Sequence, residues 1–271
     1  MNEFVKIAPN FTVRSDFVDC FRQMKLQSIN DVFDFSLGKS LTKKNLASFR
    51  ERIMFETAGP NATLFLKRYQ NIPKLTQLKN WLNRQKRIST MACDFVPAEK
   101  LQELGINTPQ TIAFGQEWNG LFEKRSFIIT EKIPDSVSLE EKLPKVTKNF
   151  IENLAAFVRK FHNTGFRHRD LYLCHIFCNS QGQFTLIDLN RVFKPFVFSQ
   201  KYCIKDLAQL YYSAPGDIVT KTDRLRFFLT YLQKEKLSRQ DKLLIKKIKS
   251  KANRMAKHDK KHNRAVPFEK D

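Results

Sequence analysis

The sequence predicts an α+β fold with two lobes, a small β-rich lobe followed by a larger helical lobe. Short apolar runs typical of strands occur before residue 131, whereas helical apolar spacing is clearest after residue 147. A chain of 271 residues with 42% hydrophobic residues is long enough to bury the core of such a domain. We expect four segments: an N-terminal extension over residues 1–34, a β-rich lobe over 35–133, a helical lobe over 134–240, and a basic helix and tail over 241–271.

The predicted first lobe consists mainly of strands. Residues 1–34 are mixed in character and predict one short helix over about 16–24. Alternation over 49–55 and the apolar run 63–69 predict a pair of strands, with Gly59, Pro60 and Asn61 as the turn between them. The remaining predicted elements are a basic helix over 72–86, a helix over 98–104 closed by Gly105, and short strands over 111–114 and 127–130.

The predicted second lobe consists mainly of helices. Residues 147–163 place Phe150, Ile151, Leu154, Phe157, Val158 and Phe161 at helical intervals, and Gly165 ends this helix. Residues 174–178 and 184–187 predict a short hairpin with its turn at 179–183, and two further helices are expected over 204–212 and 222–233.

The net charge of +21 predicts an anionic partner. An anionic membrane, a phosphorylated glycolipid and a nucleic acid all satisfy this, but no nucleic-acid recognition motif is visible, so we expect no nucleic acid. Between Lys234 and Arg264 there are 13 Lys or Arg against 3 acidic residues, and the apolar residues from Leu243 to Ile248 predict a basic amphipathic helix. We expect this helix to pack on the second lobe and to attract an anionic membrane surface.

The sequence contains no apolar run of about 20 residues and no signal-peptide pattern at its N-terminus. The five cysteines form no disulfide framework, which is typical of a reducing compartment. We therefore expect a cytoplasmic protein that is peripheral on the inner face of the cytoplasmic membrane.

Two aspartates predict phosphoryl transfer. Asp170 follows His168 and Arg169, and Asp188 follows the apolar run 184–187, 18 residues further on. Kinases use one Asp in an H-R-D loop beside the attacking hydroxyl and a second Asp, after a short strand, for the Mg²⁺ on the nucleotide phosphates. We therefore predict a bilobal protein-kinase-like fold, with Asp170 as the catalytic base and Asp188 as a metal ligand.

Two positions depart from the protein-kinase pattern. His175 stands where protein kinases place the Asn that binds a second metal ion, and Leu189 with Asn190 replace the Phe-Gly after the second Asp. A neutral imidazole is a poor ligand for Mg²⁺, which prefers oxygen. His175 is therefore either a metal ligand or a residue that orients Asp170 or Asp188.

The segments HRDLYLCH at 168–175 and IDLNR at 187–191 resemble the lipopolysaccharide core heptose kinases, which have HRD-x-Y-x-C-H and IDLHR. The resemblance extends over roughly residues 35 to 235. It implies an ATP- and Mg²⁺-dependent kinase that phosphorylates a heptose of the lipopolysaccharide inner core, a phosphotransferase with an alcohol acceptor. The alternatives are a kinase of another acceptor (Kdo, another sugar or a protein) and a non-catalytic kinase-like protein that binds an anionic ligand or nucleic acid.

The resemblance also implies the residues of the ATP site. Lys67, at the end of Leu64-Phe65-Leu66, matches the phosphate-binding lysine. Its acidic partner falls on Asp94, with Glu99 as the alternative.

Two further parts of the ATP site are implied by the same resemblance. Gly38 precedes the first strands and implies a backbone cover for the phosphates, although no Gly-rich motif is present. Glu131, Lys132 and Ile133 lie where a kinase hinge would bind adenine through backbone groups. Asp206 resembles the helix Asp that braces a kinase catalytic loop, a structural role.

Overall fold

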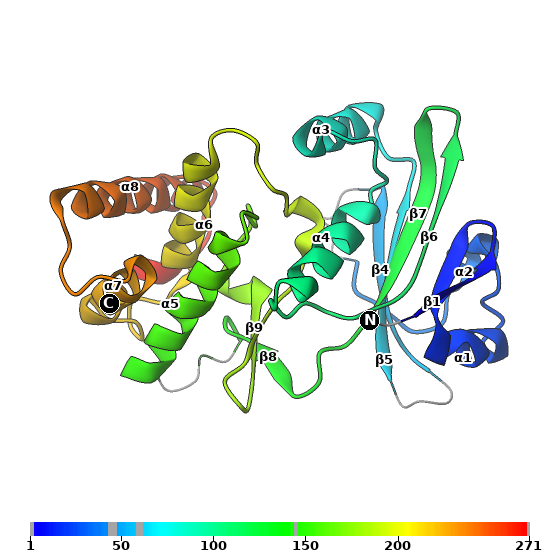
Figure 1. The fold of residues 1–271 in the computed structure, drawn as a ribbon, viewed down its shortest axis with the longest axis horizontal. Coiled ribbons are helices and arrows are strands. Elements are labelled where there is room, and N and C mark those ends of the chain that lie inside the picture. Colours follow the sequence, from blue (N-terminus) through cyan, green and yellow to red (C-terminus); the bar gives the residue numbers. More distant parts are fainter. Residues whose placement is uncertain (1–2, 43–47, 58–61, 142, 144–145, 270–271) are drawn as a thin grey trace. The chain divides into compact units, whose positions relative to one another are not determined.

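The computed structural model describes residues 3–42, 48–57, 62–141, 143 and 146–269, and the chain divides into two compact units (Figure 1). The first unit contains the chain up to Lys100 together with Pro109–Pro134, and the second contains Leu101–Thr108 together with the chain from Asp135 onward. The first is built around a large antiparallel sheet and the second around helices, so the predicted α+β class is confirmed.

The sheet of the first unit has seven strands in the order β1-β2-β6-β7-β5-β4-β3. The strands are β1 (Phe4–Ala8), β2 (Phe11–Arg14), β3 (Lys39–Ser40), β4 (Arg50–Glu56), β5 (Thr63–Gln70), β6 (Thr111–Asn119) and β7 (Phe122–Glu131). The predicted pair is present as β4 and β5, which are antiparallel. The predicted turn at Gly59, Pro60 and Asn61 lies outside the described residues. Alternate β5 residues Leu64 and Leu66 are fully buried, as expected for a strand that covers a core.

The N-terminal segment was predicted as an extension with one helix, but it contributes two strands to the sheet. β2 pairs with β6, and β1 pairs with β2. Two short helices follow, α1 (Val18–Gln23) and α2 (Ile29–Asp34). β1 lies at the sheet edge and has no buried residue, so its sequence shows little alternation. β2 does alternate and buries Phe11 and Val13, but its four residues are too few to give a clear signal. Phe11 packs edge to face on Phe127, with the ring centroids 5.0 Å apart, which joins this segment to the core.

In the rest of this region one helix matches its prediction closely, and one helix and two strands differ in extent from theirs. α3 (Lys74–Arg84) follows the predicted basic helix closely. The helix predicted from residue 98 begins earlier, as α4 (Ala92–Glu103), and includes Pro97. Pro97 lacks the amide that would bond one turn back, which removes one helical hydrogen bond without ending the helix. β6 and β7 are longer than predicted because their polar ends continue to pair as a hairpin through Trp118 and Glu123.

Arg68 fastens α2 to the sheet. Its Nη1 donates to the carbonyl oxygens of Val32, Phe33 and Phe35 at 2.9, 2.7 and 2.9 Å. Its Nε and Nη2 donate to Glu51 Oε2 at 3.0 and 2.6 Å. The last carbonyls of a helix have no partner within the helix, so this buried guanidinium supplies the donors that the end of α2 needs.

The second unit consists of four long helices and a small sheet of order β10-β9-β8. Its elements are β8 (Ser136–Ser138), α5 (Lys148–Asn163), β9 (Ile176–Asn179), β10 (Phe184–Leu186), α6 (Ser199–Ser213), α7 (Lys221–Leu232) and α8 (Arg239–Lys261). The predicted hairpin and the predicted helices are present, with α6 beginning five residues earlier than expected, at Ser199 instead of residue 204.

The basic C-terminal helix packs on the second unit, as predicted. α8 lies beside α6 in Figure 1, and Ile248, Ala252 and Ala256 are buried. Leu243, in contrast, is 53% exposed. Within the described parts of the chain, no helix has the length and apolar character needed to span a bilayer.

Replacing Arg68 with Ala should lower the free energy of unfolding by about 3 kcal/mol, because three helix-end carbonyls and the Glu51 carboxylate lose their donor. The matched control is Arg22→Ala, whose ion pair with Asp19 is exposed and should cost less than about 0.5 kcal/mol. Urea denaturation measures both. Equal losses for the two variants would show that Arg68 does not fasten α2.

Candidate active site

The loop with His168, Arg169 and Asp170 is held by the buried carboxylate of Asp206 in α6. Asp206 Oδ2 accepts from the His168 amide at 2.8 Å, and Oδ1 accepts from the Arg169 amide at 2.7 Å. The Asp206 side chain is fully buried. Arg169 has φ +68°, a left-handed conformation that is unfavourable for a residue with a Cβ. The two charge-assisted hydrogen bonds hold the backbone in this turn.

His162 of α5 completes the surroundings of Asp206. Its Nε2 lies 3.4 Å from Asp206 Oδ2, and its Nδ1 lies 3.6 Å from Cys203 Sγ. Burial acts to lower the pKa of His162, but the hydrogen bonds to Asp206 and Cys203 raise it above its ordinary value. The Asp206 carboxylate thus stabilises the charged form of the imidazole relative to the neutral form.

The Asp170 carboxylate is partly exposed and has two neighbours from other elements. Arg191 Nη1 donates to Oδ1 at 2.9 Å and to Oδ2 at 2.8 Å. Gln209 Nε2 donates to Oδ1 at 3.3 Å, and Gln209 Oε1 accepts from the Leu171 amide at 3.2 Å. Because the Asp170 side chain is 21% exposed and Arg191 is 50% exposed, an incoming hydroxyl can reach this carboxylate.

Two stacked histidines connect the Asp170 loop to Asp188. The ring centroids of His168 and His175 are 5.8 Å apart. Burial lowers the pKa of His168, which favours the neutral ring, and its Nε2 donates to the Ile187 carbonyl at 3.0 Å. His175 Nδ1 donates to the Asp170 carbonyl at 2.7 Å, since a carbonyl can only accept. The other nitrogen of His175, Nε2, lies 3.8 Å from Asp188 Oδ2.

Asp188 follows β10 in the left-handed conformation, with φ +54°. Among the described residues, no group of three or more His, Cys, Asp and Glu side chains could enclose a metal ion. Mg²⁺ on a nucleotide needs no such group, since it commonly binds one or two carboxylates together with phosphates and water. The Asp188 carboxylate fits this requirement.

In the first unit, Lys67 forms an ion pair with Asp94. Lys67 Nζ in β5 lies 3.0 Å from Asp94 Oδ1 in α4, and both side chains are at most 10% exposed. The Tyr69 hydroxyl donates to Asp94 Oδ2 at 2.9 Å. Of the two acidic partners considered from the sequence, Asp94 and Glu99, the structure pairs Lys67 with Asp94. The shorter Asp reaches the lysine because it lies in the first turn of α4.

Gly38 stands immediately before β3 with φ +110°. A Cβ at this position would clash with the Met54 carbonyl oxygen, so both the backbone conformation and the close contact with β4 require glycine. The segment from residue 43 to 47, between β3 and β4, lies outside the described residues.

The predicted hinge follows the pairing at the end of β7. The Glu131 amide donates to the Gln110 carbonyl at 2.9 Å, and the Lys132 amide donates to the Thr63 carbonyl at 2.8 Å. Ile133 is the next residue, and it is partly buried.

Three residues around Asp170 were not identified from the sequence: Arg191, Gln209 and Lys205. Lys205 Nζ donates to the Arg169 carbonyl. Closeness in sequence to predicted site residues could have indicated two of them, because Arg191 ends the IDLNR segment and Lys205 immediately precedes Asp206.

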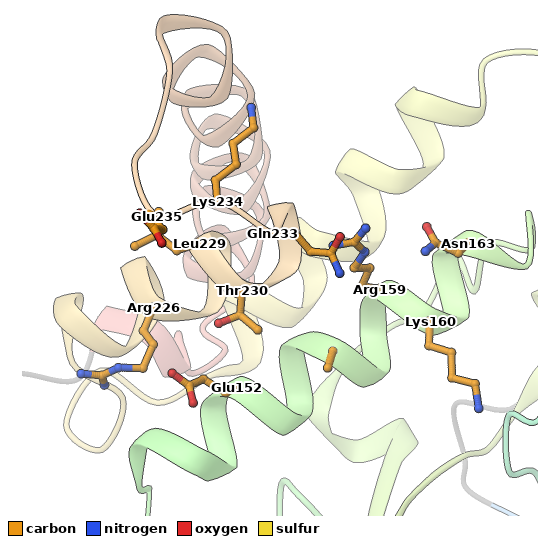
Figure 2. A pocket seen from close by; sticks show the side chains of 11 residues that line it. Glu152, Arg159, Lys160, Asn163, Arg226, Leu229, Thr230, Gln233, Lys234 and Glu235 are labelled. Atoms are coloured by element: carbon orange, nitrogen blue, oxygen red, sulfur yellow. The ribbon is translucent and has the colours of Figure 1, made fainter.

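A hollow of about 700 Å³ on the second unit lies away from the residues predicted for the site. Figure 2 shows its lining side chains, which come from α5, from α7 and from the residues after α7. The lining mixes acids such as Glu152 with cations such as Arg159, and Lys160 already donates to the Gly105 carbonyl at 2.6 Å. This mixed charge favours no single class of ligand.

The model of the lipopolysaccharide kinase (Kdo/WaaP) family matches residues 48–231. Two similar proteins are lipopolysaccharide core heptose(I) kinases WaaP. The one from Pseudomonas aeruginosa is 26% identical over 216 residues, which are 74% of this chain and 81% of that protein. The one from Escherichia coli is 26% identical over 224 residues, which are 76% of this chain and 84% of that protein.

Two further similarities are informative. A 3-deoxy-D-manno-octulosonic acid kinase from Vibrio cholerae is 26% identical over 103 residues, 37% of this chain and 43% of that protein. A solved structure described as WaaP in complex with acyl carrier protein superposes with a TM-score of 0.66 at 23% identity, covering 90% of this chain and 98% of that chain. This likeness confirms the predicted kinase-like fold.

Replacing Asp206 with Asn should lower the free energy of unfolding by about 3 kcal/mol, because the NH₂ group that replaces one carboxylate oxygen cannot accept from a loop amide and the charge opposite His162 is lost. Asp217→Asn, on the surface of the same unit, is the control and should change stability by less than about 0.5 kcal/mol. Both are measured by urea denaturation, and similar midpoints for the two variants would contradict the anchoring role.

Proposed function

Because the chain belongs to the lipopolysaccharide kinase (Kdo/WaaP) family, we propose that it transfers the terminal phosphoryl group of ATP to a hydroxyl of an inner-core heptose of lipopolysaccharide. The family match confirms the resemblance predicted from the sequence. The observation that supports the chemistry best is the connection between Asp170 and Asp188, which runs through His175. It brings a candidate base and a candidate metal ligand together in one unit.

Asp170 is the proposed catalytic base. Its carboxylate accepts the proton of the acceptor hydroxyl, or orients that hydroxyl, as phosphoryl transfer proceeds. Arg191 occupies both carboxylate oxygens in the absence of acceptor, so an arriving hydroxyl must share them with this guanidinium. Gln209 keeps the carboxylate oriented while it does so.

Asp188 is the proposed protein ligand of Mg²⁺, which when bound neutralises charge on the transferring phosphates. For His175 we favour the orienting role over ligation. Its Nδ1 is engaged by the Asp170 carbonyl, and a ring nitrogen is a poor ligand for Mg²⁺. The 3.8 Å from Nε2 to Asp188 is consistent with a residue that aligns the carboxylate.

The ATP site is proposed on the first unit. Lys67 would bind the phosphates, with Asp94 holding its ammonium in place. At the hinge, the amides of Glu131 and Lys132 are occupied by other carbonyls, so the donor to adenine falls to the Ile133 amide, beside the backbone of Glu131. Gly38 would place the backbone around β3 close to the phosphates.

The alternative acceptor is 3-deoxy-D-manno-octulosonic acid (Kdo), on which the similar Vibrio cholerae kinase acts by name. An assay with purified protein, ATP and Mg²⁺ separates the two: dephosphorylated lipopolysaccharide that contains heptose should be phosphorylated, and lipopolysaccharide that ends at Kdo should not. Protein and DNA serve as control acceptors. Transfer to the Kdo-terminated acceptor alone would replace the heptose assignment.

The proposed place of action is the inner face of the cytoplasmic membrane, where the protein binds peripherally. The outward Lys and Arg residues of α8 support this, because each basic residue near an anionic leaflet gains on the order of 1 kcal/mol.

Replacing Asp170 with Ala should reduce phosphoryl transfer by about 10²- to 10⁴-fold, since the acceptor hydroxyl loses its base. ATP affinity should persist, because Asp170 is not in the proposed ATP site. Turnover is followed by radiolabelled phosphate transfer, and ATP binding is followed by calorimetry. Turnover at the wild-type rate would remove Asp170 from the mechanism.

Replacing Asp188 with Asn should abolish the dependence of nucleotide affinity on Mg²⁺, because the neutral amide is a weaker ligand for this hard cation. Calorimetric titration of ATP with and without Mg²⁺ measures the effect, with Asp217→Asn as the control. A variant whose ATP affinity still responds to Mg²⁺ as the wild type does would exclude Asp188 as the metal ligand.

A further inference from the structure

A strongly basic groove runs between α6 and α8. We name this hollow of about 650 Å³ the α6/α8 groove. Its cations are Lys201, Lys205, Lys246, Lys247, Lys251 and Arg254. None of the described residues that line it is acidic. A hollow of this volume is in the range that holds small ligands, and its charge selects an anionic one.

The inner end of this groove adjoins the loop of the proposed base. Lys205 Nζ donates to the carbonyl of Arg169, the residue before Asp170. The Arg169 guanidinium lies over the Tyr202 ring, 5.8 Å from its centroid. Burial, followed by the charge of Arg191, lowers the pKa of Lys205. Two lining residues of the groove, Lys205 and Tyr202, thus contact the catalytic loop directly.

We propose that the α6/α8 groove is the acceptor subsite, which binds carboxylate or phosphate groups of the saccharide whose hydroxyl is presented to Asp170. The inference rests on the proposed function and adds to it the place where the acceptor's charges bind. Lys and Arg side chains supply charge-assisted hydrogen bonds to such groups. Tyr202, Ile204 and Leu243 line the same groove and supply apolar surface for the sugar rings.

The contact with the catalytic loop favours a saccharide over a bilayer as the occupant. Lys242, Lys249 and Lys257 offer a contrast, because they line a neighbouring hollow of about 630 Å³ and do not line the α6/α8 groove. The two hollows share Lys246, Ser250 and Arg254. Lys242, Lys249 and Lys257 are exposed. We assign the membrane attraction of α8 to these three residues.

The two hollows allow a matched pair of variants. The groove variant changes Lys201, Lys247 and Lys251 to Gln, and the outer variant changes Lys242, Lys249 and Lys257 to Gln. Each loses three positive charges, and Gln has a helix propensity close to that of Lys. Their thermal unfolding should agree, which controls for any loss of folding.

The first measurement is calorimetric binding of deacylated, dephosphorylated inner-core oligosaccharide, whose Kdo units retain their carboxylates, to the full chain without ATP. Wild type and outer variant should bind alike, and the groove variant should bind roughly tenfold more weakly, since each of three ion pairs contributes a few-fold. Added salt should weaken the wild-type affinity, because it screens these charges.

The second measurement is steady-state kinetics on the same oligosaccharide. The KM for the oligosaccharide should rise roughly tenfold in the groove variant, whereas kcat and the KM for ATP should stay at wild-type values. A wild type that binds the oligosaccharide but does not phosphorylate it would contradict the proposed function and leave the groove assignment standing. Equal oligosaccharide affinity in the groove and outer variants would overturn the groove assignment alone.

The comparison of the groove and outer variants also tests two other ligands of the α6/α8 groove. If the groove variant loses binding to anionic phospholipid vesicles while its oligosaccharide affinity is unchanged, the groove is a membrane contact and the proposal is wrong. If it instead loses binding to acyl carrier protein with unchanged oligosaccharide affinity, the groove is a protein-docking surface and the proposal is equally wrong.

Discussion

The buried carboxylate of Asp206 is the contact on which the candidate site depends. A buried charge is tolerated only when donors surround it, and here the donors are the amides of His168 and Arg169 together with His162. To donate both amides to Asp206, the backbone adopts the left-handed conformation at Arg169. The next residue, Asp170, then points toward Arg191 and Gln209. The hydrogen bonds from the two amides to the Asp206 carboxylate offset the energetic cost of the strained Arg169 backbone.

The arrangement of the candidate residues in the second unit could be predicted because they are close together in sequence. Asp170, His175 and Asp188 lie within one loop and one hairpin, so the spacing of the motif determines most of their arrangement. The pairing of Lys67 with Asp94 does not follow from motif spacing in the same way, since the two residues are on different elements. The register of β5 and the start of α4 decide this pairing, and α4 starts at Ala92, before the predicted start at residue 98.

The residues that were missed act through tertiary contacts or belong to weakly patterned elements. Arg191 and Lys205 are two among many cations in a chain of net charge +21, so composition alone cannot single them out. Their contacts, to Asp170 and to the Arg169 carbonyl, depend on how α6 packs behind the loop. The strands β1 and β2 were missed for a different reason, which is that they are too short to give a strong pattern. β2 pairs with β6 and buries Phe11 and Val13, whereas β1 pairs only with β2 and has no buried residue.

The large positive charge has more than one physical role, and the packing of α8 separates them. Ile248 and Ala252 lie one turn apart on the buried side, which fixes how the intervening lysines are distributed around the helix. Lys247 and Lys251 therefore line the groove beside α6, whereas Lys249 lines the neighbouring hollow. The cations that line the groove reinforce one another's field, and one of them, Lys205, contacts the catalytic loop. Lysines of equal charge on one helix thus favour different ligands. The buried apolar residues that pack α8 against α6, such as Ala252, determine which lysines line the groove.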